Sequence, residues 1–124
     1  TLEFFATAAG PVFNEMAPRV HNSGHWTIEG AVTSQFENHM RAVAGLPLGD
    51  AGMPEHAAMV NLIGGVATTE EILAIPGTSA QFYGKTPRPG RKVAHMNIVA
   101  PTREQLLERV TRAQAIAHRV NRLA

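Results

Sequence analysis

Two glutamates, Glu3 and Glu15, stand within apolar, strand-forming stretches on either side of a Gly10-Pro11 turn signal. If the two stretches pair as an antiparallel hairpin, Glu3 faces Glu15. In the same register, Phe5 faces Phe13. Directly opposed side chains lie about 5 Å apart, and like charges at that distance destabilise the pair. Because Mg²⁺ takes one or two protein carboxylates and leaves its other positions to phosphate oxygens and water, this spacing predicts half of a metal–phosphate site.

A dense polar run follows the second of these strands. Asn14 adds a neutral oxygen donor beside Glu15, although strand alternation points it to the other face unless the strand bends. The polar residues after the strand are hard to explain as core, and they are Arg19, His21, Asn22, Ser23 and His25. Solvated carboxylates and a capped surface loop remain the alternatives, and a one-residue slip would separate the glutamates. A zinc site built from His21 and His25 is disfavoured, because their spacing suits one face of a helix, whereas Pro18 and Gly24 indicate a loop.

A second group of charges lies in a turn-rich loop. Four cations fall within eight residues, namely Lys85, Arg88, Arg91 and Lys92. Arginine offers phosphate a planar fork and lysine a mobile point charge, so the loop predicts an anion site, with a merely solvated loop as the alternative. Nucleic-acid binding is disfavoured because no aromatic residue follows Tyr83, whereas single-strand binders alternate stacking rings with their cations. His95, in a strand next to the loop, stays open between a structural and a functional role.

The composition is that of an ordinary globular protein. The chain has 124 residues, 44% apolar and 17% charged, with a net charge of +1 and no cysteine. This charge implies no general attraction to nucleic acid or membrane, and without cysteine there is no disulfide framework or thiolate site. No apolar run approaches the roughly 20 residues of a membrane span, and no secretory signal is visible, so we expect a cytoplasmic protein. The chain begins at Thr1 directly with strand-like sequence, and we expect a fragment.

The elements that must position these residues are read from periodicity and capping signals. We expect helices over 34–44, 68–74 and from Thr102 to near the terminus, with a first helical turn at 27–30. We expect strands in the hairpin and over 58–63, 81–83 and 93–99, with loops over 46–55 and 84–92. Apolar stripes follow two of the helices, formed by Phe36, Met40 and Val43 and by Leu106, Val110, Ala113, Ala117 and Val120. Mixed strands and helices with hairpin-like connections predict an α+β fold.

Several stretches resemble one enzyme family. They are residues 14–29, 33–39, 45–49, 61–64 and 83–92. Together they resemble the carboxyaminoimidazole ribonucleotide synthetases, ATP-grasp enzymes of purine biosynthesis also called the ATPase subunit of phosphoribosylaminoimidazole carboxylase. The related formate-dependent glycinamide ribonucleotide transformylases share the Pro-Arg-x-His frame but carry Asp-Thr-Gly-Met where this chain has Asn22-Ser23-Gly24-His25. That tetrapeptide favours the synthetases, with the transformylases as the alternative.

The resemblance implies a fold and a reaction. Residues 1–45 would be the carboxyl-terminal portion of an ATP-grasp domain, and 46–124 a small α+β domain. In that family, ATP phosphorylates bicarbonate to carboxyphosphate, and the carboxyl group passes to the exocyclic amine of aminoimidazole ribonucleotide. ATP and Mg²⁺ are the implied cofactors, and a homodimer is the implied assembly. Because the family's amino-terminal domain and most of its ATP-grasp domain have no counterpart here, we expect the chain alone to be inactive.

The resemblance also assigns roles to single residues. The magnesium ligands would be Glu3 and Glu15, and the ATP phosphates would be contacted by Asn14 and Glu15. Bicarbonate and carboxyphosphate would be contacted by Arg19 and His21, supported by Asn22 and Ser23. The ribonucleotide would be contacted by Lys85, Arg91 and Lys92.

One departure and two rival functions remain beside this assignment. The family usually has Gly-His where this chain has Ala94-His95, which narrows the space for backbone approach there. A non-catalytic interaction module is the main rival, and it predicts self-association without a response to the ribonucleotide. A domain that binds anions or nucleic acid through Lys85–Lys92 is the other, and it predicts an affinity that falls steeply with salt.

Overall fold

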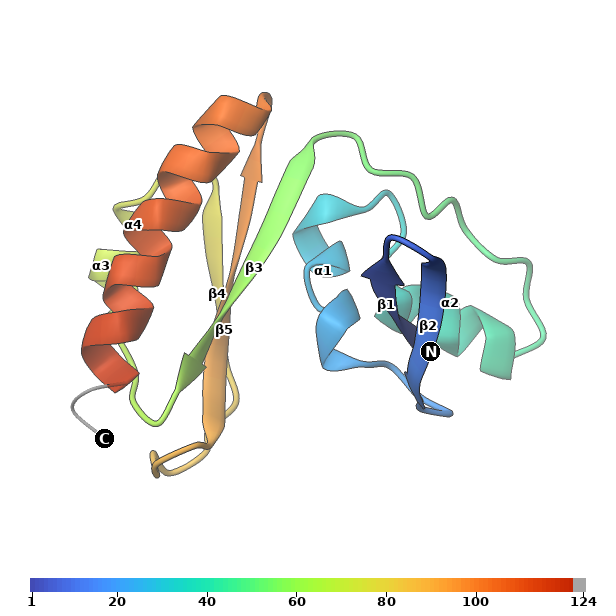
Figure 1. Ribbon diagram of the computed structural model, residues 1–124, viewed down its shortest axis with the longest axis horizontal. Helices are drawn as coiled ribbons and strands as arrows, with labels where there is room; N and C mark the ends of the chain where they lie inside the picture. Colours follow the sequence, from blue (N-terminus) through green and yellow to red (C-terminus); the bar gives the residue numbers. More distant parts are fainter. Residues whose placement is uncertain (122–124) are drawn as a thin grey trace.

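The computed structural model describes residues 1–121 and shows an α+β fold, as the sequence predicts. Two antiparallel sheets stand side by side with helices around them (Figure 1). The elements in chain order are β1 (Leu2–Thr7), β2 (Gly10–Met16), the 3₁₀ turn η1 (Asn22–Gly24), α1 (Thr27–Gly30), α2 (Gln35–Val43), β3 (His56–Ile63), α3 (Thr69–Leu73), β4 (Thr78–Phe82), β5 (Lys92–Ala100) and α4 (Arg103–Asn121).

The larger sheet carries the hydrophobic core. Its three strands are antiparallel in the order β3-β5-β4, and α4 lies along one face with α3 beside it (Figure 1). The apolar stripe of α4 packs against this face as predicted. The largest fully buried apolar side chains here are Leu62, Ile72, Val93, Met96 and Ile98. The basic loop connects β4 to β5, so this sheet holds both of its ends.

Local signals explain where the helices begin. The Ser34 hydroxyl accepts a hydrogen bond from the Glu37 backbone N–H at the start of α2. Before α3, Thr68 and Glu71 satisfy each other's backbone N–H groups in a capping box. The apolar stripe of α2 differs from expectation, since Met40 is 63% and Val43 71% exposed. Within the described residues, Phe36 of that stripe packs against the His25 ring, with the ring centroids 5.2 Å apart, and the other two side chains stay exposed.

Strand β4 begins three residues earlier than the apolar pattern predicts. Its first residue, Thr78, pairs with Ile98 of β5, and Ser79 pairs with Asn97. The first two of these three early residues are polar, so the pattern of apolar residues misses the start of the strand. Backbone pairing with the central strand β5 holds them in the sheet, and Thr78 is buried there.

The opposite face of the larger sheet receives α1 and the polar segment that precedes it. A Cβ on Gly30 would lie 2.5 Å from Ala57 Cβ, so only glycine allows this close approach of α1 to β3. The side chain of Asn97 donates hydrogen bonds to the His25 carbonyl, at 2.9 Å, and to a Glu29 carboxylate oxygen. These contacts place the polar segment beside the sheet. Among residues 1–121, no helix combines the length and the apolar character needed to cross a membrane.

Candidate active site

The hairpin brings the two glutamates together as the sequence predicts. Strands β1 and β2 pair Glu3 directly with Glu15, and the register then shifts by one residue at a β-bulge. Asn14 is the extra residue, and the bulge turns its side chain toward the carboxylates, where Nδ2 donates to Glu3 Oε1 at 2.5 Å. A bulge bends the strand and redirects a side chain, so it supplies the bend that Asn14 needs to reach this face.

The same bulge corrects the expected aromatic pairing. Beyond it, Phe4 lies opposite Phe13, and Phe5 lies opposite Val12. The rings of Phe4 and Phe13 meet edge to face with centroids 5.9 Å apart. The predicted pairing of Phe5 with Phe13 is therefore wrong, because a regular register was assumed through the bulge.

A histidine from the following loop joins the glutamates. His21 Nε2 lies 3.0 Å from Glu15 Oε1, and its Nδ1 lies 3.6 Å from Glu3 Oε2 and 2.8 Å from Ser23 Oγ. One ligand atom from each of Glu3, Glu15 and His21 lies within 4.8 Å of the others. Carboxylate oxygens are the donors that Mg²⁺ prefers, and one or two of them suffice. The glutamate pair therefore fits a hard divalent cation.

Arg19 does not join this group. Its guanidinium donates to the Val20 carbonyl at 2.9 Å and is exposed to solvent. The residue lines a separate cavity of about 320 Å³ together with Gln35 and His39. Reaching an anion beside His21 would require the Arg19 side chain to rotate away from the Val20 carbonyl.

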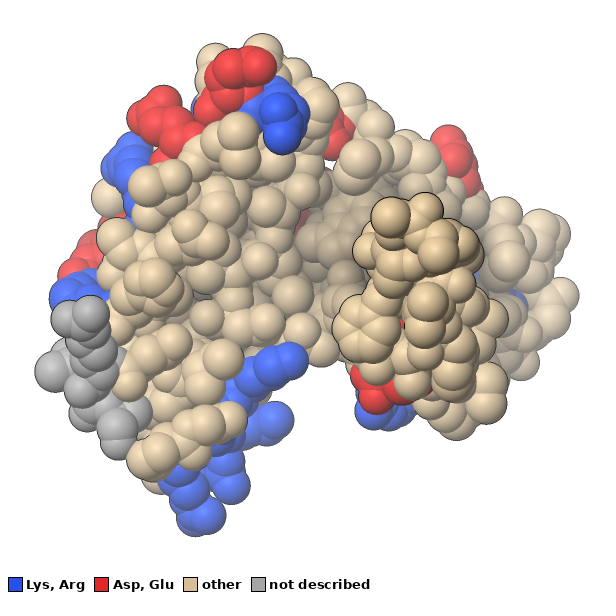
Figure 2. Space-filling model, viewed as in Figure 1, with Lys and Arg blue, Asp and Glu red and all other residues tan. Residues whose placement is uncertain are grey.

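The basic loop meets the polar segment at a second cavity. This cavity, of about 450 Å³, is lined by Asn22, His25, Tyr83, Lys85 and Lys92. Figure 2 shows lysine and arginine side chains gathered at the lower end of the larger sheet, across a hollow from carboxylates at the lower end of the hairpin. Lys85 and Lys92, two of the three residues predicted to contact the ribonucleotide, thus line the same cavity as Asn22, which is predicted to support the bicarbonate contacts. At least about 60 residues separate these lysines from Asn22 in the chain.

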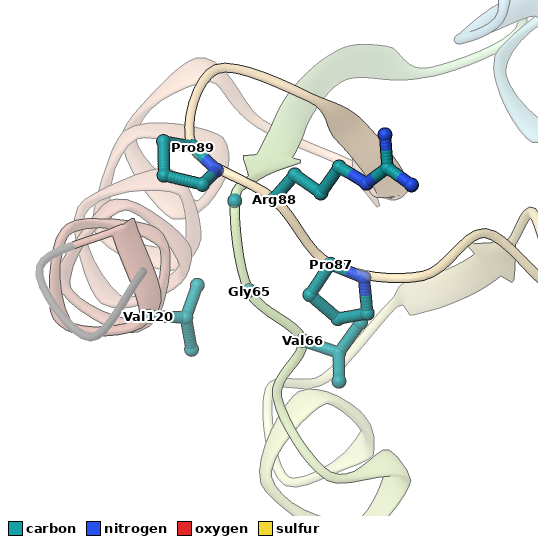
Figure 3. A pocket seen from close by; sticks show the side chains of 7 residues that line it. Gly65, Val66, Pro87, Arg88, Pro89 and Val120 are labelled. Carbon is teal, nitrogen blue, oxygen red and sulfur yellow. The ribbon is translucent and has the colours of Figure 1, made fainter.

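The two arginines of the loop lie elsewhere. Arg91 donates to the Thr86 carbonyl at 3.4 Å, within its own loop, and it is absent from the lining of the second cavity. Arg88 lies with Pro87 and Pro89 at a different cavity of about 250 Å³, bordered by Val120 of α4 (Figure 3). Neither arginine therefore lines the cavity that contains Lys85 and Lys92.

The prediction from sequence did not include Tyr83 and His25 among the site residues. The Tyr83 hydroxyl lies 2.6 Å from His95 Nδ1, and the Lys85 ammonium lies 5.3 Å from the centroid of the Tyr83 ring. The rings of His25 and His95 lie 5.3 Å apart. The position of Tyr83, directly before the basic loop, was the available signal. His25 was visible in the polar run, but only the fold shows that it reaches the lysines.

Burial favours the uncharged forms of His25, Tyr83 and His95. Burial lowers the pKa of His25, and the charges of Lys92 and His21 lower it further. Burial also lowers the pKa of His95, aided by His25. Burial raises the pKa of Tyr83. A neutral imidazole can accept at Nδ1, so we assign the Tyr83 hydroxyl as the donor to His95, which makes the lysines the cationic part of this cavity.

Comparison with known sequence families covers both parts of the chain. Residues 1–36 match the ATP-grasp domain, and residues 57–109 match the phosphoribosylaminoimidazole carboxylase C-terminal domain. An N5-carboxyaminoimidazole ribonucleotide synthase from Vibrio cholerae is 52% identical over 99 residues, which are 80% of this chain and 26% of that protein. The enzyme of the same name from Pseudomonas aeruginosa is 48% identical over 114 residues, which are 92% of this chain and 32% of that protein.

Solved structures agree with these relatives. The N5-carboxyaminoimidazole ribonucleotide synthetase of Thermus thermophilus has a TM-score of 0.89 and 53% identity, covering 93% of this chain and 32% of that one. An Aspergillus clavatus synthase in complex with ADP and 5-aminoimidazole ribonucleotide has a TM-score of 0.86 and 34% identity, covering 96% of this chain and 34% of that one. The chain thus spans between a quarter and just over a third of the length of these proteins. It belongs to the N5-carboxyaminoimidazole ribonucleotide synthase family, in which it joins the end of the ATP-grasp domain to the C-terminal domain.

Proposed function

We propose that the chain forms one side of the active site of an ATP-dependent ligase that carboxylates aminoimidazole ribonucleotide with bicarbonate. The observation that carries this proposal is the direct pairing of Glu3 with Glu15 beside His21. Such a pair is unfavourable on its own and is suited to a bound divalent cation. The division at residue 45, the homodimer and the cytoplasmic setting belong to the same proposal, on the strength of the family resemblance.

At the hairpin, the chain's own residues prepare an anion site. Glu3 and Glu15 would hold Mg²⁺, which supplies positive charge to the phosphates of ATP when it is bound. Asn14, held against Glu3, stands beside them for contact with the same phosphates. His21 and Arg19 are the proposed contacts to bicarbonate and carboxyphosphate, with Ser23 fixing the His21 ring through its hydrogen bond.

At the second cavity, the chain would hold the ribonucleotide. Lys85 and Lys92 supply two cations without a carboxylate among the lining residues, which suits a phosphate monoester. Asn22 adds an amide on the opposite wall, in the segment that leads to His21. Arg91 would take part after leaving the Thr86 carbonyl. Placing the amine of the ribonucleotide near the carboxyl donor is mainly a matter of positioning.

A non-catalytic interaction module is the second candidate, and exposed apolar side chains favour it. The most exposed of them on the hairpin and α2 are Leu2, Phe5, Phe13, Met16, Met40 and Val43. Exposed apolar side chains in this number are typical of a surface that packs against further protein. Both candidates predict such packing, so only turnover separates them.

The test uses the complete synthetase that contains this chain. We expect ATP hydrolysis that depends on both bicarbonate and aminoimidazole ribonucleotide, and we expect Glu15→Ala to abolish it. Glu55→Ala, in an exposed loop residue, is the matched control and should leave turnover unchanged. Unchanged turnover in the Glu15 variant would exclude this glutamate as a metal ligand. Absence of ribonucleotide-dependent hydrolysis in the unmodified enzyme would exclude the ligase and favour the module.

A further inference from the structure

The side chain of Gln35, the first residue of α2, uses all of its hydrogen-bonding groups on the polar segment. Its Oε1 accepts from the His21 backbone N–H at 2.9 Å. Its Nε2 donates to the His21 carbonyl at 2.7 Å and lies 2.8 Å from His25 Nδ1. An amide side chain has two donor hydrogens and one acceptor oxygen, so one residue holds both histidines.

The orientation of this amide is fixed by its partners. The His21 N–H can only donate and the His21 carbonyl can only accept, so reversing the amide would lose both bonds. Gly24 makes room for it, because a Cβ there would lie 2.6 Å from Gln35 Oε1. The Gln35 backbone N–H is itself bound by Thr27 Oγ1 at 2.9 Å, which anchors the start of α2.

The two histidines face different parts of the proposed site. The His21 ring lies against the glutamate pair, at 3.0 Å from Glu15. His25 lines the cavity that contains Lys85 and Lys92. A displacement of Gln35 would therefore move the hairpin side and the lysine side relative to each other without removing any group from either.

We infer that Gln35 is a positioning residue that aligns the carboxyl-donor side of the site with the ribonucleotide side. The inference rests on the proposed function. In the coupled reaction the amine nitrogen attacks the carboxyl carbon of carboxyphosphate, the C–O bond to phosphate breaks with its electron pair on phosphate, and the amine loses a proton. With the two sides misaligned, water takes the place of the amine, and phosphate is released without a new C–N bond.

The experiment measures phosphate released and carboxylated ribonucleotide formed in the complete synthetase. Gln35→Glu keeps the shape of the side chain but removes both donor hydrogens. Gly24→Ala keeps glutamine at position 35, but its added methyl group pushes the Gln35 side-chain amide out of position. We expect both variants to lower the ratio of product to phosphate about tenfold or more, since small misplacements of reacting groups have effects of that order. Gln114→Glu, the same change on the exposed side of α4, should leave the ratio unchanged.

The outcomes separate this inference from the function on which it rests. If the unmodified enzyme shows no ribonucleotide-dependent hydrolysis, the proposed function fails. Suppose instead that the unmodified enzyme forms about one product for each phosphate released, and that both variants lower product and phosphate by the same factor. Gln35 then has only a structural role, and the inference is overturned. If Gln35→Glu does not fold by circular dichroism, the ratio in Gly24→Ala decides alone.

Discussion

Replacing Asn97 by aspartate should destabilise the chain far more than replacing it by alanine. Asn97 is 1% exposed and lies in the central strand β5. Its amide donates to the His25 carbonyl and to Glu29, while its Oδ1 has no partner among the described residues. The two variants therefore remove the same two hydrogen bonds, but only N97D adds a carboxylate beside that of Glu29.

The magnitudes follow from these contacts. N97A loses one hydrogen bond to a neutral group, worth about 1 kcal/mol, and one to a charged group, worth about 1.5–3 kcal/mol. It also removes the unpaired Oδ1, whose burial costs about 1–3 kcal/mol, so we expect a net loss of about 1 kcal/mol. N97D loses the same two hydrogen bonds and adds an uncompensated buried charge, which by itself costs about 3–5 kcal/mol. Because the loss of the hydrogen bonds is common to both variants, N97D should be less stable than N97A by at least about 3 kcal/mol.

The assay is equilibrium urea unfolding of the 124-residue chain at pH 7 and pH 5. The single tryptophan, Trp26, contacts Gly30 in the segment that Asn97 holds, so its fluorescence reports this contact. Each variant is compared with the unmodified chain at the same pH, and Gln114→Glu is the exposed control. At lower pH a proton shared between the two carboxylates relieves their repulsion, so the deficit of N97D should shrink.

Equal losses in N97A and N97D would refute this reasoning, because they would show that the Glu29 carboxylate is not held against Asn97. A deficit of N97D that is the same at both pH values would refute the carboxylate repulsion specifically.

Three further predictions concern the site and the core. In the complete synthetase, Glu15→Gln should raise the Mg²⁺ concentration for half-maximal ATP hydrolysis about tenfold or more, equal to 1.4 kcal/mol of lost binding. Because the pKa of His25 and of His95 is lowered in the folded chain, their stabilising contribution is complete above about pH 6.5 and is lost as the pH falls through the folded pKa. The melting temperature should therefore fall on acidification, and less so in His95→Gln. Ile72→Ala, at a side chain with 0% exposure, should cost about 2–5 kcal/mol in urea unfolding, whereas Leu73→Ala, at 56% exposure, should cost less than about 0.5 kcal/mol.

The elements that were predicted well are those whose signals are local. The caps at Ser34 and Thr68 and the apolar stripe of α4 depend on residues three or four positions apart, and the structure confirms all three. The pairing of Glu3 with Glu15 was also right, but it depends on the bulge, because the register next to the turn, in which Thr7 pairs with Gly10, would otherwise place Glu3 opposite Asn14. The caps and the stripe of α4 needed only local geometry.

The errors arise where the local rule is broken or the partner lies elsewhere. The bulge at Asn14 shifted the aromatic pairs by one residue, and no pattern in the apolar residues marks it. The stripe containing Met40 and Val43 is helical as predicted, yet these two side chains are exposed among the described residues, and Phe36 is the member that packs against another ring. Amphipathic periodicity shows that a face is apolar, but it does not show what the face packs against.

The residues that join the two parts of the site are amides, and this explains why sequence analysis does not single them out. Gln35 and Asn97 bind backbone groups of the polar segment, 14 and 72 residues away in the chain. Every residue except proline offers the same backbone N–H and carbonyl, so no residue type in the segment reveals its partner. Charged residues such as Lys85 can be proposed for an anion site from their chemistry alone. An amide acquires its role only from the fold, and the alignment of the histidines with the lysines therefore depends on contacts that composition and spacing do not encode.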